Sequence, residues 1–227
     1  MRKWTYTEIK DLIETELDLK DETFITVGEL LKYTNLGIDA AEAEIHTLYE
    51  DYFLANASFT LVGGTNKYDL PSDIYANKIR GVIYDDGSDT YAMKRIRRFQ
   101  DIPVINDDTT SEYSYLLTND STDGVQINFF PNIRAEDAGS GRVTLWYIRN
   151  ATELVADDDE CDIPEFIDFV LQFVRVKVYE KEGHPSTGNA QTKLEYYRKQ
   201  MIDTLSQMVD DGDTSLEADT SFYKEMN

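Results

Sequence analysis

The segment 164–182 narrows the possible folds more than any other, because a helix over it would have almost no polar side. Its polar stripe consists of Glu165, Asp168, Gln172 and Arg175, and aliphatic or aromatic residues cover nearly everything else. Such a helix must be surrounded, either within its own bundle or by neighbouring subunits. The residues expected in the core of that bundle are Phe166, Phe169, Val170, Phe173, Leu194 and Met201.

Both ends of the chain supply helices that can surround this segment. A threonine followed three residues later by a glutamate, which is a capping box, occurs at Thr5 and again at Thr26. We expect the second helical region to break at Asn35-Leu36-Gly37, a helix-stop and turn signal. Apolar residues spaced three and four apart then recur over 38–52 and over 190–208. This spacing predicts two further packed helices.

The middle of the chain has the pattern of short strands instead. Glycine-containing turns separate segments rich in β-branched and aromatic residues. These segments are predicted to be strands joined largely as hairpins. The predicted strands lie near 58–62, 77–84, 89–94, 113–118, 125–130 and 142–150. Within 125–130, Val125, Ile127 and Phe129 point one way while Gln126, Asn128 and Phe130 point the other. This alternation predicts a half-buried strand.

The predicted fold is therefore α+β, with an inserted antiparallel β module. Residues 1–57 and 152–211 are expected to form the helical bundle, 58–151 the β-sheet or sandwich, and 212–227 a flexible C-terminal tail. The distribution of net charge supports an inserted module. The first and last parts of the chain are alike, with net charges of −8 and −11, and the middle part differs, with −3. With 227 residues, the chain can bury a core without disulfides or metals.

The composition also limits the functional class. The net charge is −22, from 44 acidic and 22 basic residues, so the chain is not expected to coat nucleic acid or an anionic membrane. No segment approaches the ~20 apolar residues that span a bilayer. The single cysteine, Cys161, excludes an internal disulfide. We expect a protein made and kept in a cytoplasm.

No motif indicates catalysis or a cofactor. His46 and His184 lack the sequence context of a metal or nucleophile site, and Cys161 has no activating base nearby, so all three are interpreted as structural. The run 157–160 with Asp162 could hold calcium, because hard cations prefer clustered oxygen ligands. It lacks the glycine and spacing of an EF-hand, which favours a solvated linker. Among 44 carboxylates a hydrolytic pair also stays possible, although no pair is singled out.

One segment is an exception to the acidity. Lys94, Arg95, Arg97 and Arg98 place four bases in five positions. A short basic patch in so negative a molecule is a poor DNA site, so we interpret it as a contact with acidic surfaces of adjacent copies that fixes their register. The alternative is a solvated strand end.

Four local motifs, taken in order, resemble a known family. They are Tyr68-Asp69-Leu70-Pro71-Ser72-Asp73 after the first helices, Trp146-Tyr147 on a late strand, the acidic linker 157–160, and Ile163-Pro164-Glu165-Phe166 opening the aliphatic helix. Their order and spacing resemble the head–tail adaptor and tail-tube-A-like neck proteins of short-tailed bacteriophages.

The resemblance implies a non-enzymatic virion protein of the phage neck. It implies a ring, expected to be twelvefold, that docks beneath the portal, contacts adjacent neck or tail rings and continues the DNA channel. It further implies a C-terminal segment that orders on the portal, with Phe222, Tyr223 and Met226 as candidate anchors. Acidic channel walls would repel the passing DNA instead of binding it.

Two other readings stay open at this point. One is a calcium- or carbohydrate-binding adhesion module of a tail or surface protein, and the other is a hydrolase that uses two carboxylates. The helical periodicity and the missing signal peptide weigh against the adhesion module.

Overall fold

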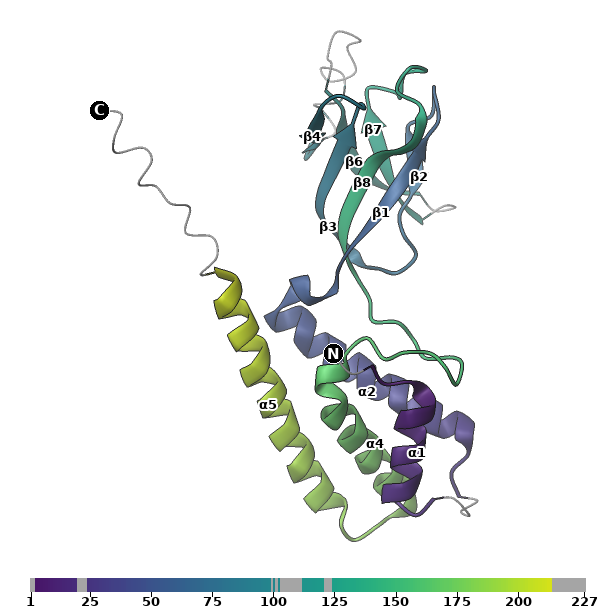
Figure 1. Cartoon of the computed structure of the whole chain (residues 1–227), viewed down its shortest axis with the longest axis vertical. Helices are drawn as coiled ribbons and strands as arrows, with labels where there is room; N and C mark the ends of the chain where they lie inside the picture. The colour runs from purple at the N-terminus through teal and green to yellow at the C-terminus, as the bar shows by residue number, and fades with distance from the viewer. Residues whose placement is uncertain are drawn as a thin grey trace, which may run out of the picture. The chain divides into compact units, whose positions relative to one another are not determined.

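The computed structural model confirms the α+β class. It describes residues 3–19, 24–98, 100, 102, 112–120 and 124–213 (Figure 1). The chain divides into two compact units. The helical unit comprises 1–52 and 151–227, and the β unit comprises 53–150.

Four α-helices build the described part of the helical unit. They are α1 (Tyr6–Glu16), α2 (Val27–Leu48), α4 (Ile167–Glu182) and α5 (Thr187–Asp213), and the short 3-10 turns η1 (Glu50–Phe53) and η3 (Pro164–Phe166) follow α2 and precede α4. Both predicted capping boxes are confirmed. At the second, the Thr26 Oγ1 accepts from the Glu29 N–H at 3.2 Å, and the Glu29 carboxylate accepts from the Thr26 N–H at 2.9 Å.

The predicted break at Asn35-Leu36-Gly37 is wrong, because α2 is continuous through it. Gly37 is buried, and a Cβ atom there would lie 3.2 Å from Val170 Cγ1, so the glycine permits close approach of α2 to α4. Asn35 bonds both backbone groups of Leu154, accepting from its N–H at 3.0 Å and donating to its carbonyl at 2.9 Å. Both residues therefore serve packing between segments and do not end the helix.

Helix α4 is the centre of the helical unit, with α1, α2 and α5 packed around it (Figure 1). Of the residues expected in the core, Phe166, Phe169, Val170 and Met201 are buried, while Phe173 and Leu194 are partly buried.

The polar stripe of α4, which was expected to face solvent, is partly buried. Gln172 is buried, and its Nε2 donates to the Ala190 carbonyl of α5 at 2.9 Å. Its Oε1 accepts from Arg175 Nη1 at 3.2 Å, and Arg175 also pairs with Glu16 of α1. Gln172 and Arg175 are thus part of a polar network that joins three helices, because their long side chains reach partners on α1 and α5.

The β unit is a sandwich of two four-stranded sheets, in the orders β1-β8-β3-β4 and β2-β7-β6-β5. The strands of the first are β1 (Leu54–Leu61), β8 (Gly139–Arg149), β3 (Ile74–Asp85) and β4 (Thr90–Ala92). Those of the second are β2 (Lys67–Asp69), β7 (Gly124–Phe130), β6 (Ser114–Asp120) and β5 (Lys94–Arg95). Buried side chains of both sheets form one core, including Val82, Ile127, Phe129, Val143 and Leu145.

The strand predictions differ from this sandwich in three ways. The described residues form eight strands and not six, since β2 and β5 are too short to show a period. Strand β1 starts at Leu54, ahead of the predicted position 58, because Ala55 and Ala57 are poor strand formers that hid its alternation. The pairing of β1 with β8 joins the two ends of the unit and is not a hairpin.

The predicted half-buried character of β7 is also wrong. Gln126 and Asn128, on its polar face, are both buried. Gln126 Nε2 donates to Asp69 Oδ1 at 2.8 Å, and Asn128 Nδ2 donates to Thr118 Oγ1 at 2.5 Å. Because β7 lies between β2 and β6, polar side chains of both neighbours cover that face.

Candidate functional site

The basic segment 94–98 is displayed outward by the residues between its bases. Met93 and Ile96 are buried in the β unit, so Lys94, Arg95, Arg97 and Arg98 are all exposed. Lys94 Nζ lies 3.4 Å from the Glu112 carboxylate, a solvated pair of little strength. Arg95, Arg97 and Arg98 form no ion pair with another residue that the structure describes. Three guanidinium groups of this segment are therefore exposed and without an ion-pair partner among the described residues.

The acidic linker 157–160 holds the N-terminal segment in place. The Asp157 carbonyl accepts from the Thr7 N–H at 3.0 Å and from the Thr7 hydroxyl at 2.7 Å. The backbone N–H groups of Ala156 and Val155 donate to Asp159 Oδ2 and lower the pKa of that carboxyl. Within the described ranges, no group of three or more His, Cys, Asp or Glu side chains is placed to hold a metal ion.

The histidines and the cysteine have structural surroundings. His46 is buried, with Nε2 3.1 Å from Glu42 Oε1, and the same oxygen accepts from the Ala151 N–H at 2.8 Å. The His184 ring stacks on Tyr179 with 4.3 Å between centroids. Burial raises the pKa of the Cys161 thiol to about 11, which keeps it protonated and unreactive near neutral pH.

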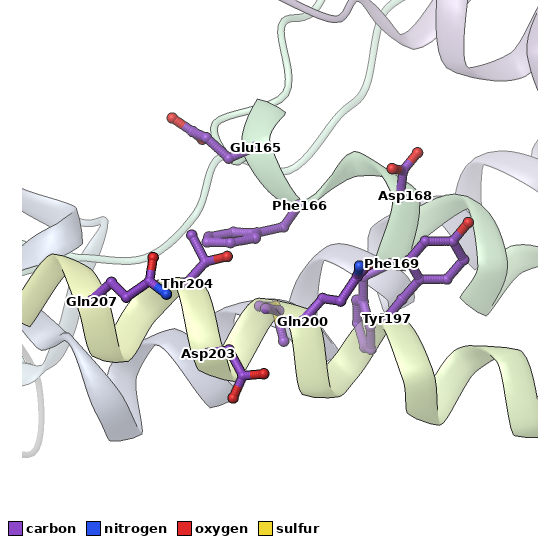
Figure 2. A pocket seen from close by; sticks show the side chains of 10 residues that line it. Glu165, Phe166, Asp168, Phe169, Tyr197, Gln200, Asp203, Thr204 and Gln207 are labelled. Carbon is purple, nitrogen blue, oxygen red and sulfur yellow. The ribbon is translucent and has the colours of Figure 1, made fainter.

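A groove that the sequence did not predict lies between the start of α4 and the C-terminal half of α5 (Figure 2). Its volume is about 360 Å³. The lining residues are Glu165, Phe166, Asp168, Phe169, Tyr197, Gln200, Met201, Asp203, Thr204 and Gln207. They include three carboxylates and three aromatic rings, and none is basic. We call this surface the acidic–aromatic groove.

A second groove, of about 370 Å³, lies in the helical unit between α2 and the segment 153–155. It is largely aliphatic, with Leu31, Leu36 and Leu154 in its lining beside Lys32. Val155 is 74% exposed at its margin, although the backbone around it is fixed by hydrogen bonds from the Leu154 N–H to Asn35 Oδ1 and from the Val155 N–H to Asp159 Oδ2.

The structure brings only some of the sequence-predicted site residues together. The four bases share one exposed edge of the β unit, and the predicted core residues Phe166, Phe169 and Met201 also line the acidic–aromatic groove. The predicted portal anchors Phe222, Tyr223 and Met226 lie outside the described residues. The sequence contains one signal of the groove, which is the start of the polar stripe. There Glu165 and Asp168 are adjacent to aromatic residues.

Across the described residues, no helix is both long enough and apolar enough to span a membrane. No curated protein matches this chain. The family model described as SU10 adaptor protein matches residues 4–220, a span that includes both units. This match covers nearly the whole chain, and the chain therefore belongs to the SU10 adaptor protein family, a family of bacteriophage head–tail adaptors.

Proposed function

We propose that this adaptor assembles into a closed ring of twelve copies that docks on the portal and continues the DNA channel toward the tail. The observation that carries the proposal is the family match over residues 4–220. An adaptor of this kind contacts portal and tail proteins, and its family is structural and not a class of enzyme. A closed ring suits this role, because cyclic symmetry presents the same surface repeatedly around a central axis.

The charge of the chain supports the channel. A net charge of −22 denies DNA the counterion release that drives non-specific binding. DNA can then pass without being held. We expect no band shift of duplex DNA by the purified protein at physiological salt, and a shift that weakens steeply with added salt would argue against an acidic lining.

The contact with the portal is assigned in this proposal to the C-terminal segment 214–227. It contains Phe222, Tyr223 and Met226, whose large apolar side chains suit insertion into pockets of a partner. Weak docking by each copy would be strengthened by the number of copies in the ring.

The experiment is the native mass of the purified protein, alone and mixed with the portal ring of the same virus. A discrete complex with many copies per portal supports the proposal and gives the stoichiometry. A chain that stays monomeric and ignores the portal overturns it, and a calcium titration would then test the adhesion alternative.

A pair of variants tests the anchors within the same experiment. Replacing Phe222, Tyr223 and Met226 with alanine should weaken portal binding at least tenfold. The matched control replaces Ser215, Thr220 and Ser221 with alanine in the same segment and should bind like the unmodified chain. Equal binding by both variants would remove the anchors from the proposal.

A further inference from the structure

We propose that the acidic–aromatic groove of one copy receives the basic segment 94–98 of a second copy. This inference rests on the proposed ring, because it specifies one contact through which adjacent subunits join.

The groove has the chemistry that recognises a guanidinium group. Figure 2 shows the rings of Phe166 and Tyr197 beside α5, with the carboxylates of Glu165, Asp168 and Asp203 spread around them. Arginine stacks its planar guanidinium on aromatic faces and donates paired hydrogen bonds to carboxylates. The ring available for stacking is that of Tyr197, which is partly exposed, while Phe166 and Phe169 are buried and form the apolar floor. The amide side chains of Gln200 and Gln207 add further acceptors to the lining. A volume of about 360 Å³ suits one or two inserted side chains.

Several other acids of the helical unit have a cation partner among the described residues, and the groove carboxylates do not. Glu29 lies 2.6 Å from Lys181, Glu44 lies 2.5 Å from Arg198, and Glu16 pairs with Arg175. By contrast, Glu165, Asp168 and Asp203 form no ion pair with any residue that the structure describes. Among the described residues, the partner of Glu165 is neutral, since its carboxylate accepts a hydrogen bond from the Tyr52 hydroxyl at 2.6 Å. The groove therefore holds negative charge that a partner can neutralise.

The basic segment is the complementary surface on the same chain. Arg95, Arg97 and Arg98 are exposed and form no ion pair within the described ranges, while the chain as a whole is strongly acidic. Two such chains repel each other at long range, so a local contact of opposite charge decides which surfaces can meet. A contact between two different surfaces repeats head to tail, and this is the kind of interface that builds a ring.

The test uses two variants with opposite charge reversals. The segment variant carries Arg95→Glu, Arg97→Glu and Arg98→Glu, and the groove variant carries Asp168→Lys and Asp203→Lys. Glu165 is left in place because it bonds Tyr52. Alone, each variant places like charges at every interface, and its self-association measured by native mass with the portal present should weaken at least tenfold.

An equal mixture of the two variants should assemble again. The reversed segment of one then meets the reversed groove of the other, and the unmodified segment meets the unmodified groove. The restored complexes should contain both variants in equal numbers. A mixture that does not recover, although each variant fails alone, would overturn the pairing of groove and segment.

A charge-matched control separates the groove from the general acidity. Glu182→Lys with Glu195→Lys makes the same change of charge on α4 and α5, at exposed positions outside the groove lining. It should assemble like the unmodified chain. If the lysine substitutions in the groove lower the melting temperature, Asp168→Asn with Asp203→Asn replaces them, and self-association unchanged by that neutral pair would overturn the inference.

The outcomes also separate this contact from the ring itself. An unmodified chain that never assembles, with or without the portal, overturns the proposed function. An unmodified chain that assembles while both reversed variants assemble equally well overturns only the groove contact and leaves the ring intact.

Discussion

The two units differ most in charge. The β unit, 53–150, carries 13 acidic and 10 basic residues and is nearly balanced at −3, so the helical unit carries the remaining −19. The acidic–aromatic groove lies on the strongly negative unit and the basic segment on the balanced one. Charge in this adaptor is therefore divided between its units: the helical unit carries most of the negative charge, and the nearly balanced β unit contains the basic segment.

The units also differ in how they bury polar groups. The helical unit has an aliphatic centre around α4, crossed by the network of Gln172, Arg175 and Glu16. The β unit has several buried tyrosines in its core, among them Tyr84, Tyr113 and Tyr115. The Tyr113 hydroxyl donates to Asp137 at 2.5 Å, and the Tyr91 hydroxyl accepts from the Tyr113 N–H at 2.8 Å. We therefore expect a buried charge to destabilise the helical unit most, and we expect high pH to destabilise the β unit through Tyr113 and Tyr147.

Phe169→Asp should have the largest effect. The side chain is 5% exposed in α4, and an unpaired carboxylate there should destabilise the helical unit by about 4 kcal/mol or more. Loss of helical circular dichroism measures it. Leu194→Asp should cost less, because Leu194 is only partly buried, and Lys199→Asp on the exposed side of α5 is the control. Equal losses in all three would mean that α4 is not the core of the unit.

The second largest effect is expected from high pH, which should destabilise the β unit. Burial raises the pKa of Tyr113 and of Tyr147 to about 12, from an ordinary value of 10.0. The unfolded chain loses these protons first as pH rises, so the stability that they contribute is complete below pH 10 and is lost as pH approaches 12. Tyrosinate absorbance together with urea unfolding across this range measures the effect. Tyr113→Phe should reduce the slope of the free energy of unfolding against pH. An unchanged slope would exclude Tyr113 as a source of the pH dependence.

Arg175→Ala should destabilise the helical unit by about 2 kcal/mol, since it leaves Gln172 without one partner and Glu16 unpaired. Urea unfolding at neutral pH measures the change. Lys177→Ala is matched to it, because it removes a more exposed ion pair to Glu180 on the same helix and should cost less than about 0.5 kcal/mol. Similar costs for both would show that the buried network adds nothing beyond a surface pair.

Gly37→Ala should give the smallest effect. Alanine favours a helix by up to about 1 kcal/mol, but its Cβ would lie 3.2 Å from Val170 Cγ1 and crowd α4. Gly28→Ala, in the same helix, meets nothing within 4 Å. The Gly37 variant should therefore melt below the Gly28 variant, by an amount equivalent to about 1 kcal/mol. The reverse order would mean that α2 and α4 can move apart without cost.

Local patterns were the features that could be predicted from the sequence. The capping boxes at Thr5 and Thr26 depend on residues three positions apart, and the apolar spacing of α4 is visible within the segment itself. The predicted break at Gly37 failed because that glycine is required by Val170, which is distant in sequence. The pairing of β1 with β8 is equally non-local.

The groove could not be predicted for the same physical reason. Its two sides, 165–169 and 197–207, meet only when α4 and α5 pack together. The exposure of the basic segment was easier to predict from the sequence. Met93 and Ile96 are apolar residues next to the bases, and their burial leaves the bases exposed. The groove that we propose as the partner of this segment could not be predicted, because it exists only in the folded chain.

The division of the helical unit into two stretches of chain, 1–52 and 151–227, has a consequence for the order of events on the ribosome. The β unit is contiguous and can fold as soon as residue 150 has emerged, whereas α1 and α2 must wait for α4. During that wait the seam of Ile38, Ala41 and Ile45, which is buried in the finished protein, has no α4 to cover it. Asp39, Glu42 and Glu44 alternate with this seam, and charges placed in this way lower the tendency of an exposed apolar stripe to aggregate.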